Sequence, residues 1–405
     1  MRAGTHGFNG ARLRQARQAR GLFGTDLARM VGVKSQTISA YEKDKGTPSP
    51  QVMQLLADRL GFPPAFFTRP TQPAEPAPIF WRASNTATRV AQERGEARLE
   101  WLRDVTDYLR QFFDFPRPNL PTLPFPADFR AITDEQIEAA AAACRVLWKL
   151  GDGPLPSVVG EMENNGVITT QIEVCADKLD AFSQWSEDGT PYAVLAVDKA
   201  SGARRFFDAA HELGHLVMHR GVEGRRVNDN ADWKLLENQA HRFASAFLLP
   251  EASFRREVWV ASLDTFAALK PRWRTSIQGM VMRCADLGMV SAEQKGFLFR
   301  ELSRRGWRKK EPHDDTLPVE GPSLIPNGVR MLVDAKVRRP DQILAELALP
   351  SADLEELTDM PRGYFSAPPA PVVALPTLKV GTGKTEGLDQ SGQGTVISLD
   401  RARRS

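Results

Sequence analysis

The segment 206–220, FFDAAHELGHLVMHR, contains residue types that could hold a metal ion and a catalytic base together. His211 and His215 are four residues apart, and Glu212 follows the first of them. If the segment is helical, both imidazoles lie on one face, one turn apart, with Glu212 beside them. Zinc-dependent hydrolysis needs this set, because zinc lowers the pKa of a water and the glutamate takes its proton. The spacing predicts His211 and His215 as zinc ligands and Glu212 as the general base.

The residues around this motif favour a packed helix rather than a surface helix with two solvated histidines, which is the alternative interpretation. Histidine is scarce, with six in the whole chain. Gly214 removes bulk beside the histidines. Apolar residues recur at helical spacing: Phe207, Ala210, Leu213, Leu216 and Val217.

A catalytic zinc needs a third protein ligand and one open position. The downstream candidates are Glu223, Asp229, Asp232, Glu237 and His241. We favour Glu237, which we expect in the first turn of a helix anchored by an apolar stripe. The alternative is a glutamate that only favours the helix dipole. His219 and His241 are candidates for hydrogen-bonding to the metal ligands without binding the metal themselves. For His219 there are two further alternatives: it could stabilise an oxyanion or cap the end of its helix, and we favour the cap.

Charge and composition bound the function. Residues 1–70 carry eleven Lys/Arg and four Asp/Glu, so this segment is +7 in a chain whose formal charge is +3. A basic end segment favours a polyanion, usually nucleic acid. Three scattered cysteines form no CxxC pair, and no transmembrane or signal segment is recognisable. We therefore expect a cytoplasmic protein, associated with the nucleoid when bound to DNA.

Hydrophobic periodicity predicts a mostly α protein with a small β-sheet, in the α+β class. Residues 166–174 and 192–197 have the composition of two short strands, and we expect 176–190 to be a loop. Phe182 and Trp185 of that loop could line a cleft or simply pack. Five regions follow from the turn and proline content: an all-α domain over 1–69, a proline-rich linker and linker helix over 70–124, a metal-binding domain over 125–310, a small helical region over 311–365 and a disordered tail over 366–405.

Three ordered motifs, RRFFDAAHELGHLVMH, ENQAHRFASAFLLP and LKPRWRTSIQGMVMRCADLGMVS, resemble the ImmA/IrrE family of zinc metallopeptidases, over about 125–310. The resemblance implies a zincin-like fold, Zn²⁺ bound by His211, His215 and Glu237, and Glu212 as the base. It also implies a helix-turn-helix repressor as the protein substrate. His241 departs from the asparagine usual in the family, so it competes with Glu237 as the third ligand.

Residues 8–69 resemble the Cro/C1-type (XRE-like) helix-turn-helix, with Gly32 at the turn. Gln36 is the best candidate for reading a base, since an amide bonds both edges of adenine. The lysines would contact phosphates, and a palindromic operator would imply a homodimer. Phe23-Gly24 departs from the Thr-Gln that is usual at the start of the second helix. The alternative to DNA binding is that this domain only docks proteins, but the local charge of +7 argues against it. The expected contacts to double-stranded DNA are Lys34, Ser35, Gln36, Thr37, Ser39, Lys43 and Lys45.

Two main functions follow. The first is a DNA-binding transcriptional regulator with a zinc endopeptidase that cuts a repressor or itself. The second is a transcription factor whose peptidase-like domain is a sensor or scaffold without proteolysis. An antitoxin-type regulator is a third and less favoured interpretation, because of the chain's length and the zinc site.

Overall fold

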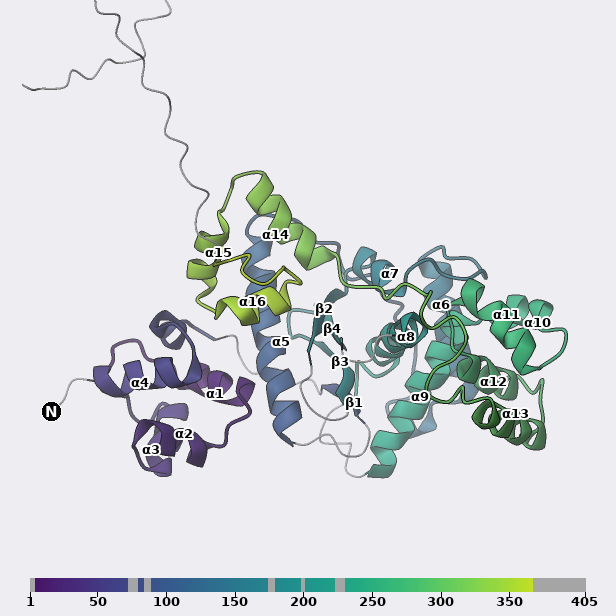
Figure 1. Ribbon diagram of the computed structural model, residues 1–405, viewed down its shortest axis with the longest axis horizontal. Helices are drawn as coiled ribbons and strands as arrows, with labels where there is room; N and C mark the ends of the chain where they lie inside the picture. Colours follow the sequence, from purple (N-terminus) through teal and green to yellow (C-terminus); the bar gives the residue numbers. More distant parts are fainter. Residues whose placement is uncertain are drawn as a thin grey trace, which may run out of the picture. The chain divides into compact units, whose positions relative to one another are not determined.

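The computed structural model describes residues 4–71, 79–83, 89–173, 179–197, 201–222 and 230–366 (Figure 1). The tail expected over 366–405 lies outside these residues from 367 onward. No helix in the described ranges is both long and apolar enough to cross a membrane. The elements are α1 (Gly10–Ala19), α2 (Gly24–Val31), α3 (Ser35–Glu42), α4 (Pro50–Leu60), η1 (Pro64–Thr68), β1 (Phe80–Ala83), α5 (Arg89–Arg110), η2 (Phe129–Ala131), α6 (Asp134–Leu147), α7 (Val158–Asn164), β2 (Ile168–Ile172), β3 (Leu179–Trp185), β4 (Pro191–Ala196), α8 (Gly202–Met218), α9 (Asn230–Leu248), α10 (Glu251–Glu257), α11 (Leu263–Trp273), α12 (Ile277–Asp286), α13 (Ala292–Arg304), α14 (Leu324–Asp334), α15 (Pro340–Leu347) and α16 (Ser351–Leu357).

The predicted α+β class is confirmed by this arrangement of helices around one four-stranded sheet. The strand order is β1-β3-β4-β2. β2 and β4 are parallel, whereas β4 with β3 and β3 with β1 are antiparallel. β1 and β2 are therefore the two edges.

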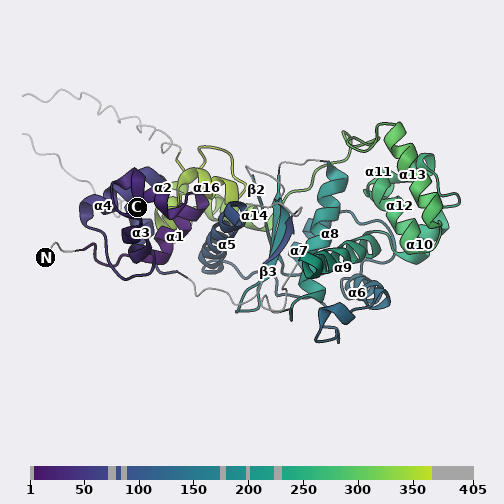
Figure 2. The ribbon, with the colours of Figure 1, turned by 90° about the horizontal axis from the view of Figure 1, so that it is seen from below.

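The sheet separates two helical layers (Figure 2). On one side α5 packs with α14 and the helix-turn-helix bundle, and side chains such as Phe182 and Tyr192 join their core. On the other side α8 covers β3 and β4, with α9 and α6 behind it, and Ala193 and Leu195 join that core. Alternation along each strand thus assigns successive residues to different cores.

The N-terminal bundle forms through local signals in the sequence. The side chain of Asn9 caps α1 by accepting from the amide of Ala11. Gly32 ends α2 in the left-handed conformation, with a φ of 71° that glycine adopts without strain. Ser49 caps α4, and Pro50 occupies its first turn.

The bundle is fixed to α5 through α1. Arg12, almost fully buried, forms a bidentate ion pair with Asp104, with its two nitrogens 2.5 and 3.1 Å from the carboxylate oxygens. Phe62 and Phe66 meet the edge of Trp101 at centroid distances of 5.5 and 6.1 Å. The C-terminal helices close the same core, since Arg20 pairs with Asp353 at 2.7 Å.

Two sequence-based expectations about the elements are wrong. Residues 179–185, expected within a loop, form strand β3; polar residues interrupt this strand and hid its pattern. Phe182 is buried in the core on the α5 side, and Trp185 packs against α8. The second error concerns the helix expected to have Glu237 in its first turn, because this helix, α9, already includes Asn230.

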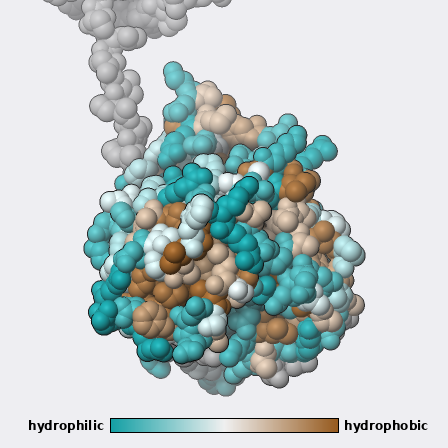
Figure 3. All heavy atoms as spheres, turned by 90° about the vertical axis from the view of Figure 1, so that its right-hand side faces the viewer, coloured by the Kyte–Doolittle hydropathy of each residue, from teal (hydrophilic) through white to brown (hydrophobic). Residues whose placement is uncertain are grey.

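Helices α10–α13 form the end of the molecule that faces the viewer in Figure 3. Apolar atoms collect there in patches bordered by hydrophilic ones. Trp259 and Val260, between α10 and α11, are largely exposed. Inside this end, Lys270 is fully buried and pairs with Glu311 and Asp314 at 2.8 and 2.5 Å. Lys270, which belongs to the family-like motif at 269–291, therefore has a structural role.

Candidate functional site

The predicted histidine–glutamate motif lies on helix α8, in the interior of the fold. The hydroxyl of Ser201 caps the start of the helix by accepting from the amide of Arg204. From there the helix runs unbroken through His211, Glu212 and His215, all of which are 0% exposed. The surface-helix interpretation is therefore wrong.

Helix α9 crosses α8 closely because Gly214 lacks a side chain. A Cβ at this position would lie 3.0 Å from the ring of Phe243, which is tighter than nine in ten real Cβ contacts. This approach brings Glu237 against both histidines. Glu237 lies two turns inside α9 and not in its first turn as expected, so the helix dipole does not account for its position.

The three side chains converge as metal ligands do. Nε2 of His211 and Nε2 of His215 are 3.1 Å apart, and the carboxylate oxygens of Glu237 lie 3.3 and 3.2 Å from them. A tetrahedral zinc at about 2.0–2.1 Å from each ligand separates ligand atoms by roughly 3.3 Å. The residues present therefore fit a zinc ion. In the described part of the chain, these three side chains form a group whose ligand atoms lie within 4.8 Å of one another, close enough to hold one metal ion.

The charge state of Glu237 suits a ligand. Burial by itself raises the pKa of this carboxyl, but hydrogen bonds from His211 and His215, and the positive charge that these rings carry when protonated, outweigh burial. The net pKa lies well below its ordinary value of 4.5. Glu237 is therefore ionised at neutral pH, as carboxylate coordination requires.

A chain of hydrogen bonds orients His215 from behind. Nδ1 of His215 is 2.9 Å from Nδ1 of His219, and Nε2 of His219 is 2.9 Å from Oε1 of Gln239. The amide of Gln239 donates to the carbonyl of Phe129 at 2.8 Å, which fixes its orientation. Burial, followed by the charge of His215, lowers the pKa of His219 to about 3, so this ring is neutral.

This chain selects one tautomer. Gln239 offers its oxygen, so the proton of His219 is on Nε2 and its Nδ1 accepts from Nδ1–H of His215. Nε2 of His215 is then left as a lone-pair donor facing His211 and Glu237. Sequence reasoning did not find Gln239. The sequence offers only one indication of its role, its position two residues after Glu237. That position cannot be interpreted without knowing how α8 and α9 pack.

The remaining candidates for a third ligand have other hydrogen-bond partners or lie outside the described residues. Asp232 is hydrogen-bonded to Arg130 at 2.8 Å. His241 is exposed and donates from Nδ1–H to the carbonyl of Glu237 at 2.6 Å, while its ring meets that of His211 edge-on at 4.5 Å. Glu223 and Asp229 lie outside the described residues.

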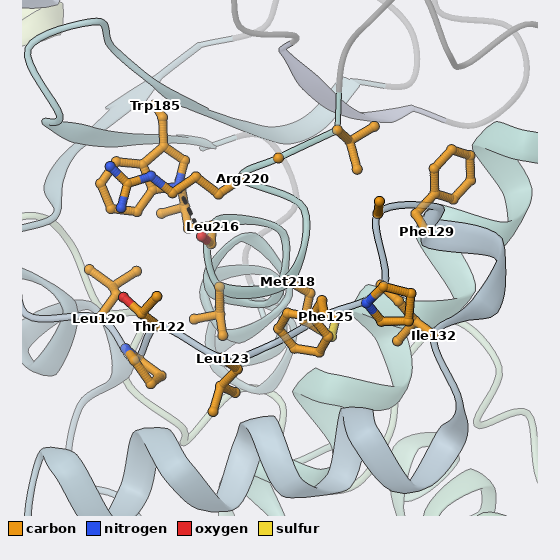
Figure 4. Close-up of a pocket in the computed structure, with 16 residues that line it drawn as sticks. Leu120, Thr122, Leu123, Phe125, Phe129, Ile132, Trp185, Leu216, Met218 and Arg220 are labelled. Carbon is orange, nitrogen blue, oxygen red and sulfur yellow. Dashed lines mark hydrogen bonds between the residues drawn. The ribbon is translucent and has the colours of Figure 1, made fainter.

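Two cavities border the motif helix. One of 460 Å³ lies along the first half of α8 and has Phe207, Asp208 and His241 in its lining. The other, of 240 Å³, lies at the C-terminal end of α8 (Figure 4). Trp185 lines it, donates from Nε1 to the carbonyl of Leu216 at 2.9 Å, and is covered by the guanidinium of Arg220 at 4.0 Å. Trp185 thus both packs and lines a cavity.

The residues predicted to contact DNA lie on or beside α3. Gln36 and Ser39 are exposed on α3, and Ser35 and Thr37 are half-buried. Lys34 and Lys43 flank the helix at its two ends and are exposed, as is Lys45. In Figures 1 and 2, α1 lies between α3 and α5, so the surface of α3 faces away from the rest of the chain.

Comparison with known proteins supports both halves of this description. Residues 13–67 match the helix-turn-helix family, and residues 164–284 match the IrrE N-terminal-like domain. The second match includes β2–β4, α8, α9 and most of α12, but neither β1 nor α5. No curated protein matches the chain.

Proposed function

From a chain that joins an XRE-type helix-turn-helix domain to an ImmA/IrrE-type domain, we propose a DNA-binding transcriptional regulator with zinc endopeptidase activity. The substrate is a helix-turn-helix repressor protein or the chain itself. The observation that carries the proposal is the convergence of His211, His215 and Glu237 beside a buried Glu212.

His211, His215 and Glu237 would hold Zn²⁺, which when bound lowers the pKa of a water and polarises a peptide carbonyl. Glu212 follows His211 on the same helix and is fully buried beside the ligands. Its role is to take a proton from the attacking water and to return it to the leaving amine. His219 and Gln239 hold His215 in the tautomer that presents its Nε2 lone pair, and His241, whose ring contacts that of His211, lines a neighbouring cavity.

The regulatory half rests on α3. Gln36 would read a base in the major groove, and Ser35, Thr37 and Ser39 lie beside it at the start of the helix. Lys34 and Lys43 would contact phosphates on either side. A homodimer on a palindromic operator and a cytoplasmic, nucleoid-associated location follow from this role.

One observation favours the second candidate, a transcription factor that binds zinc without proteolysis. The two histidines and Glu212 are fully buried, which suits a structural or sensory metal as well as a catalytic one. The two candidates share the metal ligands and differ only in whether Glu212 transfers a proton.

Glu212→Gln separates them. The substitution keeps the shape of the side chain and leaves the three ligands in place, so bound zinc should stay near one equivalent by metal analysis. Cleavage of helix-turn-helix proteins encoded beside the gene, or of the chain itself, should fall by at least about 10²-fold. The products would be followed by mass spectrometry.

Glu237→Gln is the matched control, because it removes the ligand charge and should lose zinc and cleavage together. Cleavage that survives in Glu212→Gln contradicts the role of this base. Zinc binding with no cleavage by the unmodified protein supports the second candidate.

A further inference from the structure

The edge of the sheet nearest the ligand group is made by a strand from outside the matched domain. β1 comes from the linker between the helix-turn-helix bundle and α5, and it pairs antiparallel with β3. Phe80 is opposite Ser183, and Arg82 is opposite Ala181. Without β1, the outer edge of β3 would present its unpaired amides and carbonyls, which are a template for another extended chain.

This strand lies directly over the metal-ligand helix. The ring of Phe80 stacks on the imidazole of His215, with centroids 5.0 Å apart and planes at 11°, and it also contacts His219 at 5.6 Å. Phe80 is buried. Its opposite residue, Ser183, donates from its hydroxyl to the carbonyl of Glu212 at 3.5 Å. An extended peptide that replaced β1 on β3 would therefore cross over the group proposed to be catalytic.

We propose that the outer edge of β3 is the docking edge for an extended peptide substrate, and that β1 occupies this edge in cis as a competitor. Addition of a strand to an open sheet edge is a general mode of peptide binding, in which main-chain hydrogen bonds give affinity and alternate side chains fill pockets. The place of Phe80 beside His215 and His219 is such a pocket, and it selects a peptide with an aromatic residue. This inference rests on the proposed peptidase function, because it assigns the docked peptide as the substrate.

Both ends of the linker are held on the helix-turn-helix side. Before β1, Asn9 and Arg12 bind the carbonyls of Arg69 and Pro70 at 2.9 and 2.5 Å. After β1, Arg94 of α5 binds the carbonyl of Arg20 at 3.3 Å. β1 can therefore leave β3 without separating the DNA-binding bundle from α5. β1 has only four residues, and its register with β3 shifts between Arg82 and Ala83, so we expect it to be a weak competitor for this edge.

A reversible disulfide tests the competition in the full-length protein. Arg82→Cys and Ala181→Cys place cysteines at directly opposite positions, where an antiparallel pair has Cα atoms about 4.5–5.5 Å apart and within disulfide range. The background carries Glu212→Gln to prevent cleavage and Cys175→Ser to remove a native thiol. The probe is a fluorescein-labelled peptide, Gly-Gly-Ile-Phe-Trp-Arg-Ala-Gly-Gly, which copies residues 79–83, and its binding is followed by fluorescence anisotropy.

The reduced protein should bind this peptide at least about 10-fold more tightly than the oxidised protein, a factor that corresponds to about 1.4 kcal/mol. The single variant Arg82→Cys, given the same oxidant, should not change. Phe80→Ala, which weakens the cis strand, should bind the peptide about 10-fold more tightly than the protein with Phe80. A peptide with the phenylalanine and tryptophan replaced by serine should bind neither form.

Equal binding to the oxidised and reduced forms overturns the proposal, and this arm does not depend on Phe80. The result is also separable from the proposed function. If no protein is cleaved but the disulfide blocks the peptide, the docking edge stands and the peptidase does not. If the same cysteine pair, placed in a protein that keeps Glu212, cleaves its substrate equally in both redox forms, the peptidase stands and the docking edge does not.

Discussion

The two candidate sites of this chain place their chemistry in opposite ways. In the α8–α9 pair, His211, Glu212 and His215 are fully buried, and His215 is held from behind by its hydrogen bond with His219. On α3, Gln36 and Ser39 are exposed, and Lys34 and Lys43 extend from its ends. The buried site is complete only when α8 and α9 pack against each other, whereas the exposed surface of α3 is completed by a binding partner.

This difference decides how each site responds to change. If the buried group binds zinc as proposed, removing one of its side chains should change metal binding by orders of magnitude. A contact removed from α3 affects one part of a larger DNA interface, so the loss should be small and dependent on salt.

The largest effect is expected from Glu237→Ala. The substitution removes the carboxylate that joins α9 to both histidines, so zinc should fall from about one equivalent to near none by metal analysis. Zinc stabilises the folded state in proportion to occupancy, by about 2.7 kcal/mol at a concentration 100 times Kd, and added zinc should raise the Tm of the unmodified protein only.

Asp232→Ala is the matched control for this variant. It lies on the same helix and was a candidate ligand, but it pairs with Arg130 and should keep its zinc. Loss of zinc in Asp232→Ala with retention in Glu237→Ala would reverse the assignment.

A smaller effect is expected from Gln239→Leu, which keeps the size of the side chain but removes the acceptor for His219. The ring of His219 then has no partner that fixes its tautomer, and His215 is held less firmly. Zinc affinity measured by competition with a chelator should fall about 10–100-fold. With cobalt in place of zinc, the visible absorption spectrum should also shift, because the ligand field changes.

Gln54→Leu, on the surface of α4, makes the same exchange away from the metal and should change neither quantity. An unchanged cobalt spectrum and affinity in Gln239→Leu would mean that His215 is positioned by packing alone.

Gln36→Ala tests the exposed side of the comparison. If Gln36 reads a base, the variant should lose about 1–3 kcal/mol of discrimination between the operator and a site changed at one base pair. Zinc content and Tm should stay within the range of ordinary surface substitutions, about 0.5 kcal/mol. Unchanged sequence preference in a binding titration would remove Gln36 from the recognition surface.

The sequence predicted the parts of both sites that depend on local spacing. The i, i+4 histidines of α8 and the Gly32 turn are each set by a few neighbouring residues. Glu237 was selected for a wrong reason, since it lies two turns into α9 rather than at its start. What holds it is the close crossing at Gly214 and Phe243, which involves residues far apart in sequence.

The parts that sequence could not supply are all contacts between distant segments. Gln239 has a role only because the carbonyl of Phe129 accepts from its amide. β3 was missed because Ser183 and Gln184 interrupt an apolar run, although both are buried in the folded sheet. β1 lies in a segment that composition describes as linker, and its pairing with β3 is specified by the partner strand.

The smallest effect is expected from Lys43→Ala, and it sharpens the comparison most because it should change only one quantity. Lys43 follows α3, is exposed, and is expected to contact a phosphate. Its loss should weaken binding similarly for operator and unrelated DNA, and should reduce the slope of log Kobs against log salt by about 0.9. Lys309→Ala, exposed but far along the chain after α13, should leave this slope unchanged. A change of zinc affinity in Lys43→Ala would contradict the separation of the two sites, because a surface charge about a Debye length or more from a buried ion is screened.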